Sequence, residues 1–101
     1  MTEHSDAFHL ANRLDEFAED AGFEHIGGCF GTTWSKDYGK EFRVVLYIAG
    51  VPEKKLHFAA TVYKNTEGKD DERVFDAFGS SPEWVAAKAR KWVTEGGKTN
   101  G

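Results

Sequence analysis

Residues that could bind a metal are few in this chain, and three of them form one possible group. His25 and Cys29 are an even number of residues apart, so on a β-strand their side chains would share one face. Together with His57 they would supply three ligands of a tetrahedral zinc site. We favour the simpler interpretation of surface histidines and a half-buried thiol, and we expect no metal and no cofactor.

Patterns typical of an active site do not occur in the sequence. It contains no phosphate-binding loop, nucleophile elbow or dinucleotide fingerprint. The acidic segment "NTEGKDDE" lacks the spacing of a calcium loop. Paired carboxylates such as Asp15 and Glu19 are better interpreted as the solvated surface of a helix. We therefore expect no catalytic residues and a protein that is not an enzyme.

A cluster of acids is the first candidate for binding a partner. The net charge is −4, but residues 1–26 hold seven acidic residues and a single basic one. Four of these acids crowd into the C-terminal half of the first expected helix, where the helix macrodipole disfavours negative charge. No structural benefit offsets that cost, which favours a role in binding for Asp15, Glu16, Glu19 and Asp20.

The second candidate surface lies on two segments of alternating polarity. "EFRVVLYIAG" and "LHFAATVYK" each combine one apolar face with one mixed face, as in an antiparallel sheet covered on one side. The mixed faces would present Arg43, Tyr47, His57 and Tyr63 outward. Such a surface is typical of an interface, through which a homodimer is also possible. The alternative is that these residues serve cross-strand pairing alone.

Two helices are expected to bracket these strands. Apolar residues recur with helical spacing from Ala7 to Ala21, where Ser5 or Asp6 could cap the first turn and Gly22 could end the last. In the middle, "FEHIGGCFGTTW" is strand-like but rich in glycine, and "SKDYGK" predicts a turn.

The segment "VFDAFGSSPEW" predicts a change from strand to helix. Residues 73–78 alternate as a short fourth strand, with Arg73 on the same face as Phe75 and Ala77. Ser80 or Ser81 could then cap the second helix, with Glu83 completing a capping box three residues after Ser80. Trp84 would lie off the apolar stripe of that helix. It either packs at the corner between strand and helix or stands exposed as an anchor for a partner.

These elements predict an α+β fold, a two-layer sandwich with an antiparallel meander of three to four strands flanked by an N-terminal and a C-terminal helix. Residues 1–97 form one domain and residues 98–101 a frayed tail. No segment has the length of a membrane span, and no secretory signal is visible. The single cysteine favours a reducing compartment, so we expect a soluble cytoplasmic protein.

The order of helix, three strands and helix resembles that of the double-stranded-RNA-binding domain. That family contacts phosphates with basic residues at the start of its last helix. Here the helix begins "SSPEWVAAKARK", with Glu83 in its first turn and Lys88, Arg90 and Lys91 later. Nucleic-acid binding is therefore the alternative function, and a nucleic-acid partner is not expected from an acidic chain.

A second resemblance concerns the whole architecture. A small acidic αβ-meander whose sheet leads through "FGSSPEWVAAKA" into a terminal helix resembles small phage-encoded anti-defence proteins, of which anti-CRISPR proteins are examples. The resemblance implies a stoichiometric inhibitor that binds a host nucleic-acid-binding complex, with acidic surface as a mimic of nucleic acid. It assigns no residue. The sequence thus predicts a non-enzymatic protein-binding module.

Overall fold

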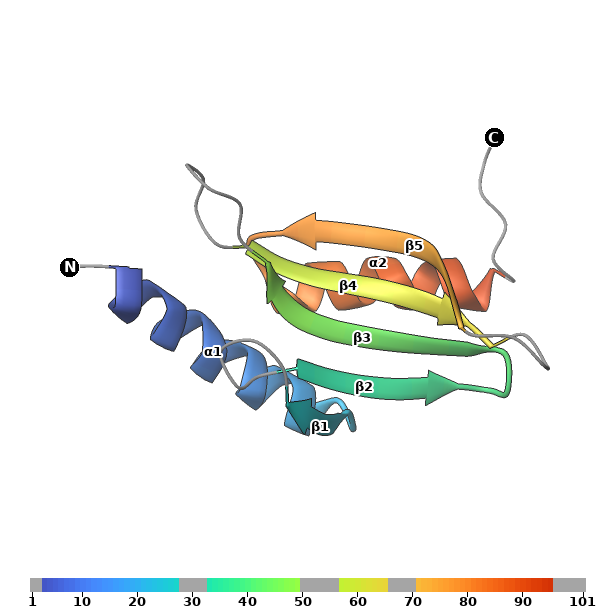
Figure 1. The fold of residues 1–101 in the computed structure, drawn as a ribbon, viewed down its shortest axis with the longest axis horizontal. Coiled ribbons are helices and arrows are strands. Elements are labelled where there is room, and N and C mark those ends of the chain that lie inside the picture. The colour runs from blue at the N-terminus through green and yellow to red at the C-terminus, as the bar shows by residue number, and fades with distance from the viewer. Residues whose placement is uncertain (1–2, 28–32, 50–56, 66–70, 96–101) are drawn as a thin grey trace.

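The architecture is a five-stranded antiparallel sheet with one helix at each end of the chain (Figure 1). The computed structural model describes residues 3–27, 33–49, 57–65 and 71–95, with side chains from residue 9 onward. The strands follow one another in the order β1-β2-β3-β4-β5, so the sheet is a meander. The elements are α1 (Glu3–Asp20), β1 (Glu24–Gly27), β2 (Thr33–Tyr38), β3 (Phe42–Ala49), β4 (His57–Lys64), β5 (Glu72–Gly79) and α2 (Pro82–Thr94).

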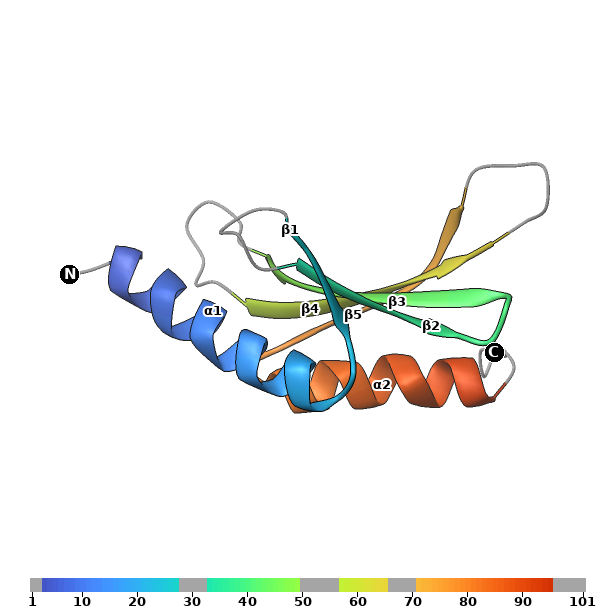
Figure 2. The ribbon, with the colours of Figure 1, turned by 90° about the horizontal axis from the view of Figure 1, so that it is seen from below.

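Both helices lie on one face of the sheet, which confirms the predicted two-layer α+β class (Figure 2). We call this the inner face and the opposite one the outer face. Alternate residues of β3 and β4 supply the core between sheet and helices, and they are buried together with Leu14, Ala18 and Val85. The strand residues in this core are Val44, Leu46, Ile48, Phe58, Ala60 and Val62.

The predicted strand count of three to four is wrong, because "SKDYGK" is not a turn throughout. Residues 33–38 form β2, which pairs with β3 from Trp34 opposite Leu46 to Tyr38 opposite Phe42. Trp34 and Tyr38 pack against the core from the inner face, and this apolar contact favours the extended conformation over a turn. The turn is confined to residues 39–41, where Gly39 has a positive φ of 72°.

The C-terminus of α1 follows the predicted pattern. Gly22 has a φ of 86°, its amide bonds to the carbonyl of Glu19, and the amide of Phe23 bonds to the carbonyl of Ala18. This is the Schellman arrangement, and it returns the buried Phe23 to the core. At the other end, α1 begins at Glu3, so the prediction of a cap at Ser5 or Asp6 is wrong.

The start of α2 was predicted correctly at Ser81 but not in its detail. Ser81 is the N-cap, and its hydroxyl accepts a hydrogen bond from the Trp84 amide at 3.2 Å. Glu83 is therefore one residue too early for a capping box with Ser81, and the predicted pairing with Ser80 is wrong. The Glu83 carboxylate instead accepts a hydrogen bond from the Ser81 hydroxyl at 2.7 Å.

A β-bulge in β5 changes which residues face outward. Val62 pairs with Phe75 and Tyr63 pairs with Arg73, so Val74 is an extra residue in the ladder. Both Val74 and Phe75 pack against the core. Arg73 is consequently on the outer face, opposite to the face it was predicted to share with Phe75.

Candidate binding surface on the outer sheet face

The outer face carries neither of the two helices, and cross-strand pairing arranges its side chains in rows (Figure 2). Arg43, Tyr47 and Tyr63 lie on it as predicted, and so does His57, which pairs with Ala49 at the far end from Arg43. The first of three main rows consists of Asp37, Arg43, Tyr63 and Arg73. The second row consists of Ser35, Val45, Thr61 and Asp76. The third row consists of Tyr47, Ala59 and Phe78.

A hydrogen-bonded chain crosses the middle of this face. The Thr61 hydroxyl donates to a carboxylate oxygen of Asp76 at 2.8 Å, and its oxygen lies 2.9 Å from the Tyr47 hydroxyl. A hydroxyl has one proton to donate, and an ionised carboxylate can only accept. Tyr47 must therefore donate to Thr61, which leaves the phenol oxygen of Tyr47 able to accept a hydrogen bond from outside.

The chain continues to the edge of the sheet as an ion pair. Arg73 Nε lies 3.6 Å from the second carboxylate oxygen of Asp76. The two residues are three apart in the sequence, a spacing that would put them on opposite faces of a regular strand. The bulge at Val74 brings them to the same face. Asp76 and Arg73 are functional candidates that the sequence reasoning missed, because their contacts depend on strand register.

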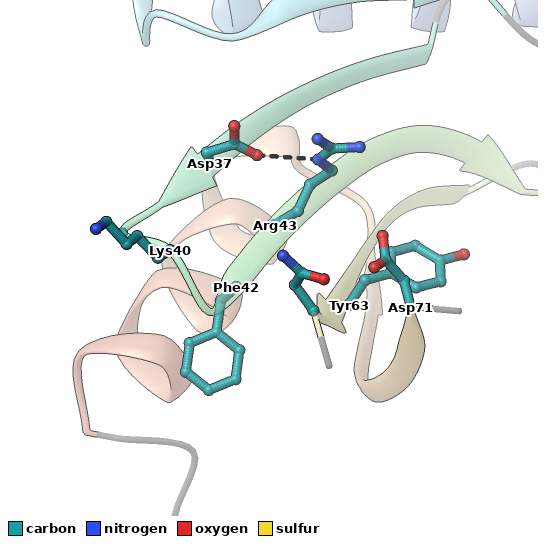
Figure 3. A pocket seen from close by; sticks show the side chains of 8 residues that line it. Asp37, Lys40, Phe42, Arg43, Tyr63 and Asp71 are labelled. Atoms are coloured by element: carbon teal, nitrogen blue, oxygen red, sulfur yellow. Dashed lines mark hydrogen bonds and ion pairs between the residues drawn. The ribbon is translucent and has the colours of Figure 1, made fainter. Parts of the chain in front are cut away.

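An open cavity of about 510 Å³ lies at one end of the outer face (Figure 3). Arg43 Nε donates to Asp37 at 2.9 Å beside it, and this hydrogen bond, with the charge of Asp37, raises the pKa of Arg43. Tyr63 and Asp71 also line this cavity. Its lining combines acidic, basic and aromatic groups: Asp37, Gly39, Lys40, Phe42, Arg43, Tyr63, Asn65 and Asp71.

The other end of the face is apolar. Phe78 is 54% exposed, and it lies across from Ala59, which in turn pairs with Tyr47. Ala59 is 1% exposed although neither α1 nor α2 covers this face, and its two neighbours in the row, Tyr47 and Phe78, have larger side chains. The alternation of Asp76 and Phe78 with Phe75 and Ala77 was the sequence signal that could have identified Phe78 as an outward residue.

The predicted acidic cluster on α1 does not act as one free surface. Asp15 is half-buried and accepts a hydrogen bond from the indole nitrogen of Trp34 at 2.9 Å, so it joins α1 to β2. Glu16, Glu19 and Asp20 are exposed. This hydrogen bond is therefore a structural reason for an acid in the C-terminal half of α1, where the helix macrodipole disfavours negative charge.

Trp84 lies at the corner between β5 and α2, and it is 49% exposed. Its ring packs against Gly79, where an added Cβ would lie 2.8 Å from the Trp84 Cε3 atom. The Lys88 ammonium lies 5.3 Å from the centre of the same ring. Trp84 thus lies at the predicted corner, against Gly79, and about half of it is exposed; its role as an anchor for a partner stays a prediction.

The histidines of the zinc alternative lie on opposite faces of the sheet. His25 pairs with Trp34 on the inner face, whereas His57 pairs with Ala49 on the outer face. Cys29 falls outside the described residues. Within residues 3–27, 33–49, 57–65 and 71–95, no three histidine, cysteine or acidic residues are grouped to hold a metal ion. In the same part of the chain, neither helix has the length and apolarity of a membrane span.

Comparison with known proteins gives no relative from which a site could be transferred. No protein-family model, no curated protein sequence and no solved structure matches this chain.

Proposed function

We propose that this protein is a non-enzymatic protein-binding module and that the outer sheet face is its binding surface. The single observation that carries the proposal is the exposed Phe78 beside Ala59 and Tyr47 on a sheet face that no described helix covers. Aromatic residues and arginine are enriched at the centres of protein interfaces. The outer face offers both, with Arg43 and Tyr63 at its opposite end.

The polar middle of the face supports the same proposal. Thr61 is 1% exposed, and its hydroxyl has a donor in Tyr47 and an acceptor in Asp76. A partner that covers this region would not leave the Thr61 hydroxyl unpaired, so the desolvation cost of binding is small there. The accepting oxygen of Tyr47 gives the surface one polar contact with a defined direction.

The outer face is a better candidate than the acidic cluster. Asp15 already accepts the Trp34 indole proton, which leaves Glu16, Glu19 and Asp20 as exposed acids on α1. The finer expectation, a phage-type inhibitor that mimics nucleic acid, would rest on these three residues and stays a prediction. The cytoplasmic location and a homodimer through the outer face also stay predictions.

The placement of the basic residues on α2 favours a protein partner over nucleic acid. Lys88 lies over Trp84, next to β5. Arg90 is two residues further along α2, a spacing that puts it on a different side of the helix. The two charges are thus on different flanks of the helix, where they do not form the single basic stripe that phosphate recognition requires.

The test is the capture of proteins from native lysate by three immobilised forms of the chain. We expect the wild type and a Glu16→Lys, Glu19→Lys, Asp20→Lys variant to retain the same specific partner, and Tyr47→Ala, Phe78→Ser to lose it. Circular dichroism of each variant checks that the fold persists. Retention by the outer-face variant and loss by the charge-reversed one would contradict the proposal, as would steep salt-dependent binding of duplex RNA or DNA.

A further inference from the structure

The two edges of the sheet differ in how well they are protected against pairing with another strand. β1 forms one edge with four residues, and its register shifts between His25 and Gly27. β5 forms the other edge with eight residues, and after its bulge at Val74 the ladder with β4 is regular from Phe75 to Gly79. No described element pairs with the free side of β5 (Figure 1). Short, irregular edges resist strand addition, whereas a regular edge offers backbone donors and acceptors to it.

Exposed aromatic rings lie on both sides of this regular segment. Phe78 is on the outer face and is 54% exposed. Trp84 comes from α2, on the inner side of the sheet, and its ring packs against Gly79. An extended chain added beside β5 would send alternate side chains to the two faces. It would meet Phe78 with one set and Trp84 with the other.

On the inner side of this site, the charge over the Trp84 ring is positive, whereas Asp76 of β5 lies on the outer side. Lys88 lies over the Trp84 ring, at 5.3 Å from its centre. Glu83, the acid that precedes Trp84, is directed away, because it binds the Ser81 hydroxyl and pairs with Arg13 of α1 at 3.5 Å. An acidic side chain on the inner side of an added strand would therefore find a cation there and no competing acid from Glu83.

We propose that the free edge of β5 binds an extended segment of a partner protein, which adds to the sheet as a further strand. Apolar side chains on one face of that segment pack on Phe78, and on its other face a side chain packs on Trp84 and an acidic one pairs with Lys88. Main-chain hydrogen bonds to β5 provide affinity, and the two rings and Lys88 provide selectivity. This site shares Phe78 with the proposed outer-face surface but takes an added strand at the β5 edge, and the inference does not depend on the rest of that surface binding anything.

The experiment uses two synthetic octapeptides in which valine alternates with threonine and one central threonine is replaced by glutamate or by lysine. Amide exchange of the isotopically labelled full chain is followed by nuclear magnetic resonance with and without each peptide. We expect the glutamate peptide to protect alternate amides between residues 75 and 79 and to shift the Trp84 indole signal. The lysine peptide should bind roughly three- to tenfold more weakly, because it loses one exposed ion pair and its positive charge is repelled by Lys88.

Matched variants separate this site from other apolar contacts. Trp84→Ala and Phe78→Ser should each weaken binding of the glutamate peptide about tenfold or more. Ile26→Ser is the control, because Ile26 is also 54% exposed but lies on the β1 edge, and it should leave the affinity unchanged. Trp84→Phe keeps an aromatic ring and should retain most of the affinity.

Three results would overturn the proposal. In the first, neither peptide binds. In the second, a peptide shifts the Trp84 signal without protecting any amide of β5, which would show side-chain docking alone. Alternatively, the β5 amides become protected without peptide as the protein concentration rises, which would show that a second copy of this chain occupies the edge. If the outer-face variant captures the same partner as the wild type, the peptide affinities and the amide protection of β5 can still be measured and interpreted.

Discussion

The two faces of the sheet use the same strands to achieve burial in different ways. On the inner face, Val44, Leu46 and Val62 are excluded from water by two helices. On the outer face, Ala59 and Thr61 are each 1% exposed although neither α1 nor α2 lies on that face. Ala59 lies between the larger Tyr47 and Phe78, and Thr61 lies between Val45 and Asp76. Low exposure on these strands therefore does not depend on the two helices alone.

The two kinds of burial should differ in their energetic origin. The inner face gains from close packing of apolar side chains, where a deletion leaves a cavity. The outer face gains from the hydrogen bonds that connect Tyr47, Thr61 and Asp76, each with a modest net contribution. This difference can be tested by changes at neighbouring positions of the same strands.

The largest effect is expected from a pair of identical side chains on opposite faces of β3. Val44 is 1% exposed on the inner face, and Val45 is half-buried on the outer face. Val44→Ala should lower the free energy of unfolding by about 2–3 kcal/mol, because it removes buried methyl groups and leaves a cavity. Val45→Ala should cost less than about 1 kcal/mol. Urea denaturation measures both, and equal losses would show that the two faces are buried in the same way.

A smaller effect is expected from the polar chain of the outer face. Thr61→Val keeps the shape of the side chain but leaves the Asp76 carboxylate and the Tyr47 hydroxyl without their shared partner. We expect a loss of about 1–2 kcal/mol. Tyr47→Phe should cost less, because it removes only the outer end of the chain. A double-mutant cycle with both changes should give a coupling energy of at least about 0.5 kcal/mol. Additive losses would mean that the chain does not act as a unit.

The smallest effect concerns the junction of the two helices that cover the inner face. The Ser81 hydroxyl, the Glu83 amide and the charge of Arg13 together lower the pKa of Glu83, against a smaller opposing effect of desolvation. Because the folded pKa is lowered, the ionised carboxylate stabilises the fold above its unfolded pKa of about 4.3, and this stability is lost as the pH falls through the folded value. The side chain of Glu83 is 57% exposed, so the effect is small.

Glu83→Gln isolates this contribution. The variant should unfold slightly more easily than the wild type at neutral pH, and the difference should vanish in acid. Melting temperatures between pH 7 and pH 3 measure it, with the exposed Glu19→Gln on α1 as the matched control. A difference that persists unchanged to pH 3 would show that the Glu83 charge has no part in the helix junction.

Local sequence patterns predicted the helices and the faces of the central strands well. The apolar spacing of α1, the turn at Gly22 and the cap at Ser81 depend on residues close together in the chain. The alternation in β3 and β4 likewise assigned Arg43, Tyr47 and Tyr63 to the outer face and the apolar face of both strands to the core. These features need only the periods of helices and strands and the conformational freedom of glycine.

The features that were predicted wrongly or missed depend on contacts between segments that are distant in the sequence. Residues 35–38 resemble a turn by composition, but the contacts of Trp34 and Tyr38 with the core make them part of a strand. The bulge at Val74 moved Arg73 to the outer face, where it meets Asp76. Asp15 accepts a hydrogen bond from the Trp34 indole, which is nineteen residues away in the sequence. None of these contacts has a local signature.

The sequence by itself therefore determined the class of the fold, the C-terminus of α1, the start of α2 and the polarity of the central strands, because each of these follows from neighbours within a few residues. Only the tertiary structure decided the number of strands, the composition of the outer face and the contrast between a short, irregular edge at β1 and a regular one at β5. The physical reason is that register, bulges and edges are properties of paired strands, and a strand's own sequence does not specify which partner it will meet or where.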